Sequence, residues 1–576
     1  MPGRLRLLQT LWAAAHGPVR TINNPPRFVQ AWRADQAGLL PPPRLFGQIS
    51  GCAAGPPQLE WAAGRTRDLA RADRHTATAM KPSSPSSSPS SLSTTAASSS
   101  RTATSTTAGD PAEPSPIQPF AERTVAVPDT PEAQAATAVI ASLRAAGHSA
   151  FLVGGCVRDL VLGLDPKDYD VATSARPTDV SELFDRVVEV GVAFGVVRVL
   201  LKRGGKLQET EVATYRVDGP YADGRRPTEV VFTDAREDVL RRDFTLNGLL
   251  LDPLAPSGGQ VIDWVDGIAD LERGHLRAIG EPPLRFSEDA LRMLRAVRFA
   301  ARFGLHIETK TAAAIMRLRD GLGQISRERV HAELVGMLKP PHAGEAVRLL
   351  SRLGLAQTLW PALVAQDPGL RRTERRLRAL CDGVHWASLE TNLAPSRDSL
   401  PAVVGLPFAL ALAGFLWTAR PTGGALPEGI AADLRLSTAE TRMLRDIWRI
   451  ADVLLASLCA PQLPAVRATD AGTARLLREP HADAALRLLI AEADNDPSGW
   501  PHSARTWLRA LRRLRLETPI AQWRPQLWVT GEDLKRLGHA PSATFRVAIT
   551  AAETVQLQGG SPDEAWLAAA AAFAAT

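Results

Sequence analysis

A short apolar segment that runs directly into two glycines constrains the fold of this chain more than any other feature. Residues 150–153 predict a buried strand, and Gly154 and Gly155 turn the chain into a helix predicted at residues 157–162. Such a turn leaves backbone N–H groups free to bind a phosphate, and the missing Cβ atoms let that phosphate approach closely. Most Gly-Gly pairs are only turns, so this pattern needs support from other residues.

That support comes from two aspartates some 13 residues after the turn, in the stretch Asp168-Tyr169-Asp170. A strand is predicted at residues 169–172, and residues two apart on a strand lie on the same face. Both carboxylates could therefore hold the same divalent ions, and hard oxygen ligands suit Mg²⁺ bound together with substrate phosphates. An isolated Asp-x-Asp is usually a solvated turn, and glycosyltransferases also use one to hold a nucleotide sugar.

The surroundings of these residues predict a mixed α/β unit at residues 131–281. Ala135, Val139, Ile140 and Leu143 recur at helical spacing up to Gly147, and strands are predicted at residues 195–201 and 209–213. Beyond Pro282 the pattern is helical almost to the Ala-rich end. We expect an α/β head with a mixed sheet, a helical neck at 282–345, and a helical body and tail at 346–576.

Residues 1–120 differ in texture from everything that follows. The tract from Ser83 to Thr107 consists almost wholly of Ser, Thr, Pro and Ala, which cannot bury enough apolar surface to offset chain entropy. We expect a disordered extension. Its first 34 residues contain several arginines and no acid, which is typical of an organellar transit peptide. The alternative is that translation starts later, for example at Met80.

Composition excludes several classes of protein. Four widely spaced cysteines predict neither a disulfide framework nor a zinc site and suit a reducing compartment, which favours a cytoplasmic protein. No apolar run approaches 18 residues, so no membrane span is expected. His342, His385 and His481 are isolated, so no added hydrolase site is expected. The formal charge of +6 suits a polyanionic partner but is weak support for one.

Three further segments narrow the family. ETEVATYRVDGPYADGRRP at 209–227, RRDFTLNGL at 241–249 and EDALRMLRAVRF at 288–299 follow the Gly-Gly and Asp-x-Asp segment in this order. Together they resemble class II CCA-adding tRNA nucleotidyltransferases and their bacterial poly(A) polymerase relatives, within the DNA polymerase β-type superfamily. SRERVHAELVGML at 326–338 and VTGEDLKRLG at 529–538 resemble later segments of that family. The convincing match covers residues 131–340.

The resemblance implies a role for each matching residue. Asp168 and Asp170 would bind the metals, with Glu211 as a less secure third catalytic carboxylate. The nucleotide would be bound by Gly154, Gly155, Arg158, Arg242, Asp289, Arg292, Arg295 and Arg298. Gly248 departs from the family, which usually has Ala there.

The arginine stripe can also be interpreted from its spacing. Residues 289, 292, 295 and 298 are three apart and stay adjacent along a helix, beside an apolar stripe of Leu291, Leu294 and Val297. A packed helix of this kind presents its arginines either to solvent or to a charged ligand. The family resemblance favours a ligand.

The implied reaction is attack of an RNA 3′-hydroxyl on the α-phosphate of CTP or ATP, with two Mg²⁺ ions stabilising the entering and leaving oxygens. Without a template, side chains must imitate a base edge. Asp289 offers acceptors and Arg292 offers a fork of donors, which together match cytosine or adenine.

The expected partners are tRNA, CTP and ATP, with no obligatory protein partner. The helical half would hold tRNA by shape and phosphate contacts, with the basic runs at 371–378 and 505–515 as candidates. Solvated helix faces are the alternative for both runs.

A poly(A) polymerase remains an alternative function, although the Gly-Arg-Arg-Phe-like stretch of such relatives is missing from VVEVGVAFGVVRVLL at 187–201. Addition of CC or A alone is a further alternative, although the loop at 217–227 favours full CCA addition. An inactive RNA-binding protein and a sugar-nucleotide transferase fit the motifs less well.

Overall fold

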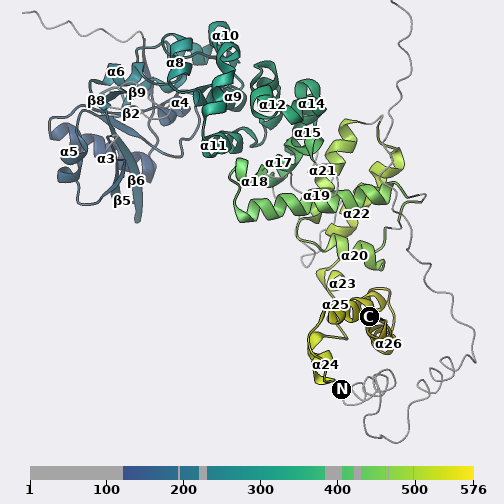
Figure 1. The fold of residues 1–576 in the computed structure, drawn as a ribbon. Coiled ribbons are helices and arrows are strands. Elements are labelled where there is room, and N and C mark those ends of the chain that lie inside the picture. The colour runs from purple at the N-terminus through teal and green to yellow at the C-terminus, as the bar shows by residue number, and fades with distance from the viewer. Residues whose placement is uncertain are drawn as a thin grey trace, which may run out of the picture. The chain divides into compact units, whose positions relative to one another are not determined.

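The computed structural model describes residues 121–575, except 192–194, 219–229, 383–404, 421–429, 461, 465 and 497–498. The extension predicted at 1–120 and most of the loop at 217–227 therefore lie outside the described residues. Strands and the helices between them occupy the blue part of the ribbon, and the teal to yellow part is helical (Figure 1). This arrangement confirms the predicted fold class for the described residues.

An eight-stranded mixed sheet forms the centre of the head. Its order is β1-β10-β9-β2-β3-β6-β5-β4, and only the pair β3 and β6 is parallel. The strands are β1 Ala121–Val125, β2 Ala150–Val153, β3 Val171–Thr173, β4 Val187–Gly191, β5 Val196–Arg203, β6 Lys206–Thr214, β9 Leu249–Asp252 and β10 Gly259–Asp263.

Both faces of this sheet are buried at its central strands β2, β3 and β9. Leu152, Val171 and Leu251 belong to the main core on one face, which α3 (Pro131–Ala145) covers with the apolar positions predicted for it. Their neighbours Val153 and Ala172 point into a second core on the other face. This alternation follows from the two-residue period of a strand, and it leaves the strand ends available for a site.

Several boundaries in the head differ from the prediction by a few residues, and two of these differences bear on the sheet and the site. β1 lies ahead of residue 131, where the globular part was expected to begin, and pairs with β10. β3 begins at Val171 rather than Tyr169, so Asp168 and Asp170 lie in the segment just before the strand. Asp170 is nevertheless tied to the sheet, because its carbonyl oxygen accepts a hydrogen bond from the Val153 N–H (3.0 Å).

The remaining helices of the head connect these strands, and short paired strands accompany them. The helices are α4 Gly155–Val161, α5 Pro177–Leu183, α6 Ala235–Leu240 and α7 Gly267–Glu272; the short strands are β7 Arg216–Asp218, β8 Val230–Phe232, β11 His275–Leu276 and β12 His306–Ile307.

Beyond Pro282 the described residues are almost wholly helical, as predicted. The helices are α8 Pro282–Glu288, α9 Leu291–Phe303, α10 Thr309–Leu318, α11 Arg327–Met337, α12 Ala343–Arg352, α13 Leu355–Leu359, α14 Pro361–Gln366, α15 Arg371–Cys381, α17 Phe408–Phe415, α18 Ile430–Asp433, α19 Thr438–Leu458, α20 Ala471–Leu477, α21 Ala482–Asn495, α22 His502–Glu517, α23 Ile520–Trp523, α24 Gly531–Arg536, α25 Ala543–Leu557 and α26 Pro562–Ala574.

The main core continues from the head through these helices to Trp523 of α23 and also includes Leu557 at the end of α25, whereas most buried residues of α24, α25 and α26 form a separate small core around Phe545 and Trp566. Within the described ranges, no helix combines the length and apolarity that crossing a membrane requires.

Candidate active site

A cavity of about 430 Å³ lies where the Gly-Gly turn meets the start of α9. It draws residues from five separate segments of the chain, which the fold brings together. Its lining consists of Gly154, Gly155, Arg158, Asp170, Arg241, Arg242, Asp243, Asn247, Asp289, Leu291, Arg292, Arg295, Phe299 and Arg329. Eight of the predicted site residues therefore share one cavity, whereas Asp168, Glu211 and Arg298 are not among its lining residues.

The turn itself requires glycine. Gly154 has φ 74° and ψ −122°, a conformation that residues with a Cβ rarely adopt, and it immediately precedes α4. Its N–H donates to the Leu249 carbonyl (3.2 Å), which fixes the turn against β9. A Cβ at this position would lie 3.3 Å from Nη1 of Arg242, so the absence of a side chain keeps the guanidinium close to the turn.

Three carboxylates gather beside the turn. Burial and the negative charges of Glu211 and Asp168 together raise the pKa of Asp170 to about 6, against the opposing positive charge of Arg242. Asp168 and Glu211 are both exposed, and β6 carries Glu211 next to β3. Among the described residues, no three His, Cys, Asp or Glu side chains converge closely enough to form a metal site by themselves. The carboxylates thus interact electrostatically, with Asp170 alone facing the cavity.

Arg242 is held at the cavity by Asp238 of α6. Its Nε and Nη2 donate to Oδ2 of Asp238 at 3.2 and 2.8 Å. Burial opposes ionisation of Asp238, but Arg242 and Arg241 together lower its pKa. Asp238 thus remains a carboxylate that fixes the position of Arg242.

Arg158 is almost completely buried, and all three of its side-chain nitrogens donate to the protein. Nε and Nη2 bind Oδ1 of Asp159 (2.8 and 2.6 Å), and Nη1 binds Oδ1 of Asn247 (2.7 Å). The guanidinium also lies 4.5 Å from the ring centre of Phe303. Burial lowers the pKa of Arg158, against the raising effect of Asp159. Because its side-chain nitrogens are already bound to the protein, Arg158 contributes mainly a fixed positive charge to the cavity.

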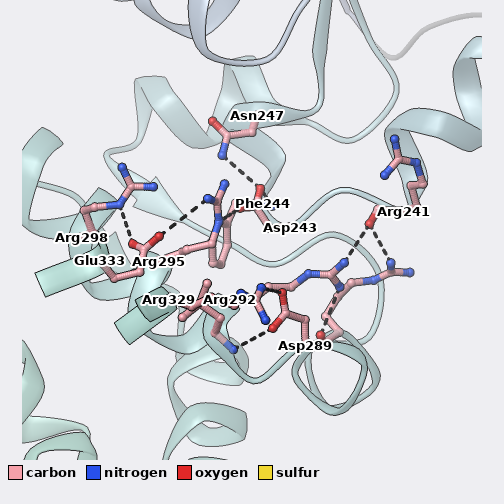
Figure 2. Close-up of polar contacts among 12 residues, drawn as sticks. Arg241, Asp243, Phe244, Asn247, Asp289, Arg292, Arg295, Arg298, Arg329 and Glu333 are labelled. Atoms are coloured by element: carbon pink, nitrogen blue, oxygen red, sulfur yellow. Dashed lines mark hydrogen bonds and ion pairs between the residues drawn. The ribbon is translucent and has the colours of Figure 1, made fainter. Parts of the chain in front are cut away.

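Asp289 and Arg292 each have a separate partner (Figure 2). Oδ2 of Asp289 accepts from Nη2 of Arg329 at 2.6 Å, and its Oδ1 accepts from the Leu291 N–H at 3.0 Å. Nη1 of Arg292 donates to Oε2 of Glu288 at 2.6 Å. Asp289 was expected on the arginine helix, but its φ of −147° and ψ of 102° separate α8 from α9. It instead precedes the helix and binds one of its first N–H groups.

Arg295 and Arg298 share an acid on α11. Oε2 of Glu333 accepts from Nε of Arg298 (2.6 Å), and Oε1 lies 3.9 Å from Nη1 of Arg295 (Figure 2). Arg295 also donates to Oδ2 of Asp243 at 2.7 Å. Only Arg295 lines the cavity, so the two arginines predicted to act alike occupy different places.

Asp243, Asn247, Arg329 and Phe299 also line the cavity, and none of them was assigned a role from the sequence. Burial opposes the charge of Asp243, but Arg295 and Asn247 lower its pKa. All four lie within segments that the motifs already marked, at 241–249, 288–299 and 326–338. The motif boundaries could therefore have identified them, but their individual contacts could not.

Tight packing explains why residue 248 is glycine. A Cβ there would lie 2.8 Å from Cγ2 of Val265 and 3.1 Å from Cδ1 of Ile279. Alanine would require these two buried side chains to move. The departure from the family pattern is therefore accommodated by the second core of the sheet and does not reach the cavity.

The basic runs in the helical half divide between surface and interior. Arg371 and Arg375 of α15 are exposed, whereas Arg376 is fully buried and donates to Glu492. In α22, Arg512 and Arg515 are buried and only Arg505, Arg509 and Arg513 remain less covered.

The isolated histidines also have local partners: His342 contacts the Gly336 carbonyl and His481 contacts Asp446, while His385 lies outside the described residues.

Comparison with known proteins identifies the head. The family described as Poly A polymerase head domain matches residues 150–277, and the one described as probable RNA and SrmB-binding site of polymerase A matches residues 304–366. A CCA-adding enzyme of Lactiplantibacillus plantarum is 42% identical over 242 residues, which cover 42% of this chain and 57% of that enzyme. One from Enterococcus faecalis is 46% identical over 208 residues, covering 36% of this chain and 49% of that enzyme. The chain thus matches about half the length of these curated relatives.

Solved structures show the same fold over a longer range. The crystal structure of the Bacillus stearothermophilus CCA-adding enzyme in complex with CTP superposes with a TM-score of 0.53 and 28% identity, covering 75% of this chain and 94% of that one. The Thermotoga maritima CCA-adding enzyme complexed with tRNA_CCA gives 0.53 at 18% identity, covering 78% and 99%, which shows the fold alone. These comparisons confirm the resemblance indicated by the motifs: part of this chain is similar to CCA-adding enzymes, and its residues 150–277 match the Poly A polymerase head domain.

Proposed function

We propose that this protein is a nucleotidyltransferase that adds C, C and A to the 3′ end of tRNA, using CTP and ATP and no template. The observation that carries the proposal is the cavity itself. It brings the Gly154-Gly155 turn and Asp170, which suit a triphosphate and its metal ions, within one space with Asp289 and Arg292, which suit a base edge. The relatives named above support the same reaction class.

The donor set fits Mg²⁺. Asp170 faces the cavity, and the charges of Asp168 and Glu211 raise its pKa, so a divalent cation there would relieve the repulsion among three carboxylates. Mg²⁺ commonly takes one or two protein carboxylates and completes its shell with water and substrate phosphates. We assign Asp168 and Asp170 as ligands, with Glu211 as an additional carboxylate. When bound, the metal ions would neutralise charge on the attacking and leaving oxygens.

The remaining residues position and neutralise the triphosphate. In the proposed reaction the tRNA 3′-oxygen forms a bond to the α-phosphorus, the bond to the β-phosphate oxygen breaks, and pyrophosphate leaves. Gly154 and Gly155 let the phosphates approach the N-terminus of α4. Arg158, Arg242 and Arg295 supply fixed positive charge, each held in place by an acidic side chain.

The base would be read by Asp289 and Arg292. Each oxygen of the Asp289 carboxylate accepts one hydrogen bond from the protein and has a second lone pair for the amino group of cytosine or adenine. Arg292 uses Nη1 for Glu288 and for the Arg285 carbonyl, and Nη2 has only a long contact (3.4 Å) with the Arg241 carbonyl. Nε and Nη2 therefore keep N–H groups for the ring nitrogen that lies beside that amino group.

Two further features of the proposal concern the rest of the chain. We propose that the helices after residue 346 hold tRNA through exposed arginines such as Arg371 and Arg375, since the buried members of the same runs are not accessible. We also propose a cytoplasmic location, because the described cysteines are free thiols, which suits a reducing compartment.

The proposal is tested by sequencing the product. The full chain is incubated with Mg²⁺, all four nucleoside triphosphates and tRNA that lacks its last three residues. Addition of C, C and A followed by arrest supports the proposal. Long A tails on many RNAs would identify a poly(A) polymerase, and arrest after CC, or activity only on tRNA already ending in CC, would identify a partial enzyme. No incorporation of any nucleotide would indicate an inactive RNA-binding protein.

A further inference from the structure

We infer that Arg329 is a specificity-determining positioning residue, which holds Asp289 away from Arg292 so that both can face the base. The inference rests on the proposed function, because it concerns how the same cavity distinguishes cytosine from uracil and adenine from guanine. Arg329 comes from α11, some 40 residues after Asp289. Its guanidinium reaches the cavity wall and points at the Asp289 carboxylate (Figure 2).

The two base-reading side chains carry opposite charges and are three residues apart. Asp289 lies directly before α9 and Arg292 lies in the first turn of that helix, so the two side chains are close enough in the chain to pair with each other. Such a pair would cover the acceptor of Asp289 and the donors of Arg292 at once. In this structure each side chain binds a different counter-ion: Asp289 binds Arg329, and Arg292 binds Glu288.

The Arg329–Asp289 pair is well placed to hold this arrangement. The distance from Nη2 to Oδ2 is 2.6 Å, and the side chains are only 22% and 14% exposed, so water competes weakly for either partner. The other Asp289 oxygen is fixed by the Leu291 N–H. With both oxygens held, the carboxylate cannot rotate toward Arg292 unless one of these bonds breaks.

The helix that carries Arg329 is itself anchored to the arginine helix. Val330 and Leu334 of α11 are buried in the main core, and Glu333, one turn after Arg329, binds Arg298 of α9 at 2.6 Å. The position of Arg329 is therefore set by packing that does not depend on Asp289. A rigid support of this kind favours selection of a base over loose attraction of any anion.

The consequence for specificity follows from the base edges. Cytosine and adenine present an amino group where uracil and guanine present a carbonyl oxygen. An Asp289 that is held open accepts from the amino group and repels the carbonyl. If Arg329 is removed, Asp289 can turn toward Arg292, and this distinction weakens.

The test measures kcat/KM for all four nucleoside triphosphates, on tRNA lacking its last three residues and on tRNA lacking only the terminal A. The variants are Arg329→Ala, Arg329→Lys and the control Arg327→Ala, which removes an exposed arginine from the first turn of the same helix. In Arg329→Ala we expect the CTP/UTP and ATP/GTP ratios to fall about tenfold, the scale of one lost hydrogen-bonded contact. Arg329→Lys should recover part of the ratio, and Arg327→Ala should retain the wild-type value.

Two outcomes would overturn the inference. If Arg329→Ala slows all four nucleotides by the same factor, Arg329 binds phosphate or supports the fold, and the inference is wrong. Unchanged ratios in both Arg329 variants would also overturn it. A wild-type protein that adds neither C nor A would refute the proposed function itself, whereas normal wild-type addition with unaltered variant ratios would refute the inference alone.

Discussion

Two arginine-rich helices of this protein look alike in the sequence and differ in what their arginines contact. α9 reads LRMLRAVRFAARF and α15 reads RRTERRLRALC. In α9, Arg292 binds Glu288 and Arg295 binds Asp243, and both arginines also line the cavity. In α15, Arg376 is fully buried, with Nε bound to Glu492 and Nη1 bound to the Gly414 carbonyl.

The difference teaches that pairing alone does not identify a functional arginine. Every one of these three side chains has a carboxylate partner within 2.7 Å. What separates them is whether donors remain on a side that a ligand can reach. We therefore expect changes in α9 to alter catalysis and changes at Arg376 to alter stability, and the following predictions test that division.

The largest effect is expected at the carboxylate that faces the cavity. Asp170→Asn should lower nucleotide incorporation at least about a thousandfold, since bound metal ions contribute several kcal/mol to such reactions. Binding of tRNA should change by less than about twofold, because phosphate contacts elsewhere determine affinity. Rapid-quench incorporation and filter binding measure the two. The exposed Asp165→Asn serves as the control, and near-normal incorporation in Asp170→Asn would refute the assignment.

The next effect concerns stability and belongs to α15. Arg376→Ala leaves Glu492 buried without its closest partner and should destabilise the fold by about 3–5 kcal/mol. Arg375→Ala, one position earlier and exposed, should change the free energy of unfolding by no more than about 0.5 kcal/mol. Urea denaturation measures both. Equal losses in the two variants would contradict the distinction between buried and exposed arginines within this helix.

A smaller difference is expected between two arginines of α9 itself. Arg295 lines the cavity, so Arg295→Ala should raise KM about tenfold, and by the same factor for all four nucleotides. Arg298 does not line it and binds Glu333, so Arg298→Ala should raise KM by about threefold or less. The result that would reverse this order is a larger rise in KM for Arg298→Ala.

Local features of the fold could be predicted from the sequence because they depend on neighbouring residues. The strand at Ala150–Val153 has the predicted bounds, and the buried face of α3 includes Ala135, Val139, Ile140 and Leu143. β1 was missed because AERTV is too polar to indicate a strand by itself. Its pairing with β10 supplies the missing stabilisation, from residues far along the chain.

The site could be predicted as a set of residue types but not as a set of contacts. The motifs marked Asp289 and Arg292, yet the spacing placed Asp289 on a continuous helix, which the break before Ala290 contradicts. The burial of Arg376 was beyond prediction for a related reason: its partner Glu492 is 116 residues away. Long-range pairing decides whether an arginine faces a ligand or the core, and no local pattern reveals it.

The division between the two helices is tested most directly by measuring selectivity and stability together in Arg292→Ala and Arg376→Ala. In Arg292→Ala the CTP/UTP ratio of kcat/KM should fall about ten- to a hundredfold, with a loss of only about 2–4 °C in Tm, because Glu288 is partly exposed and can be hydrated. In Arg376→Ala the Tm should fall by roughly 10 °C while the ratio measured at low temperature stays at the wild-type value. A loss of selectivity in Arg376→Ala, or an unchanged ratio in Arg292→Ala, would contradict the account.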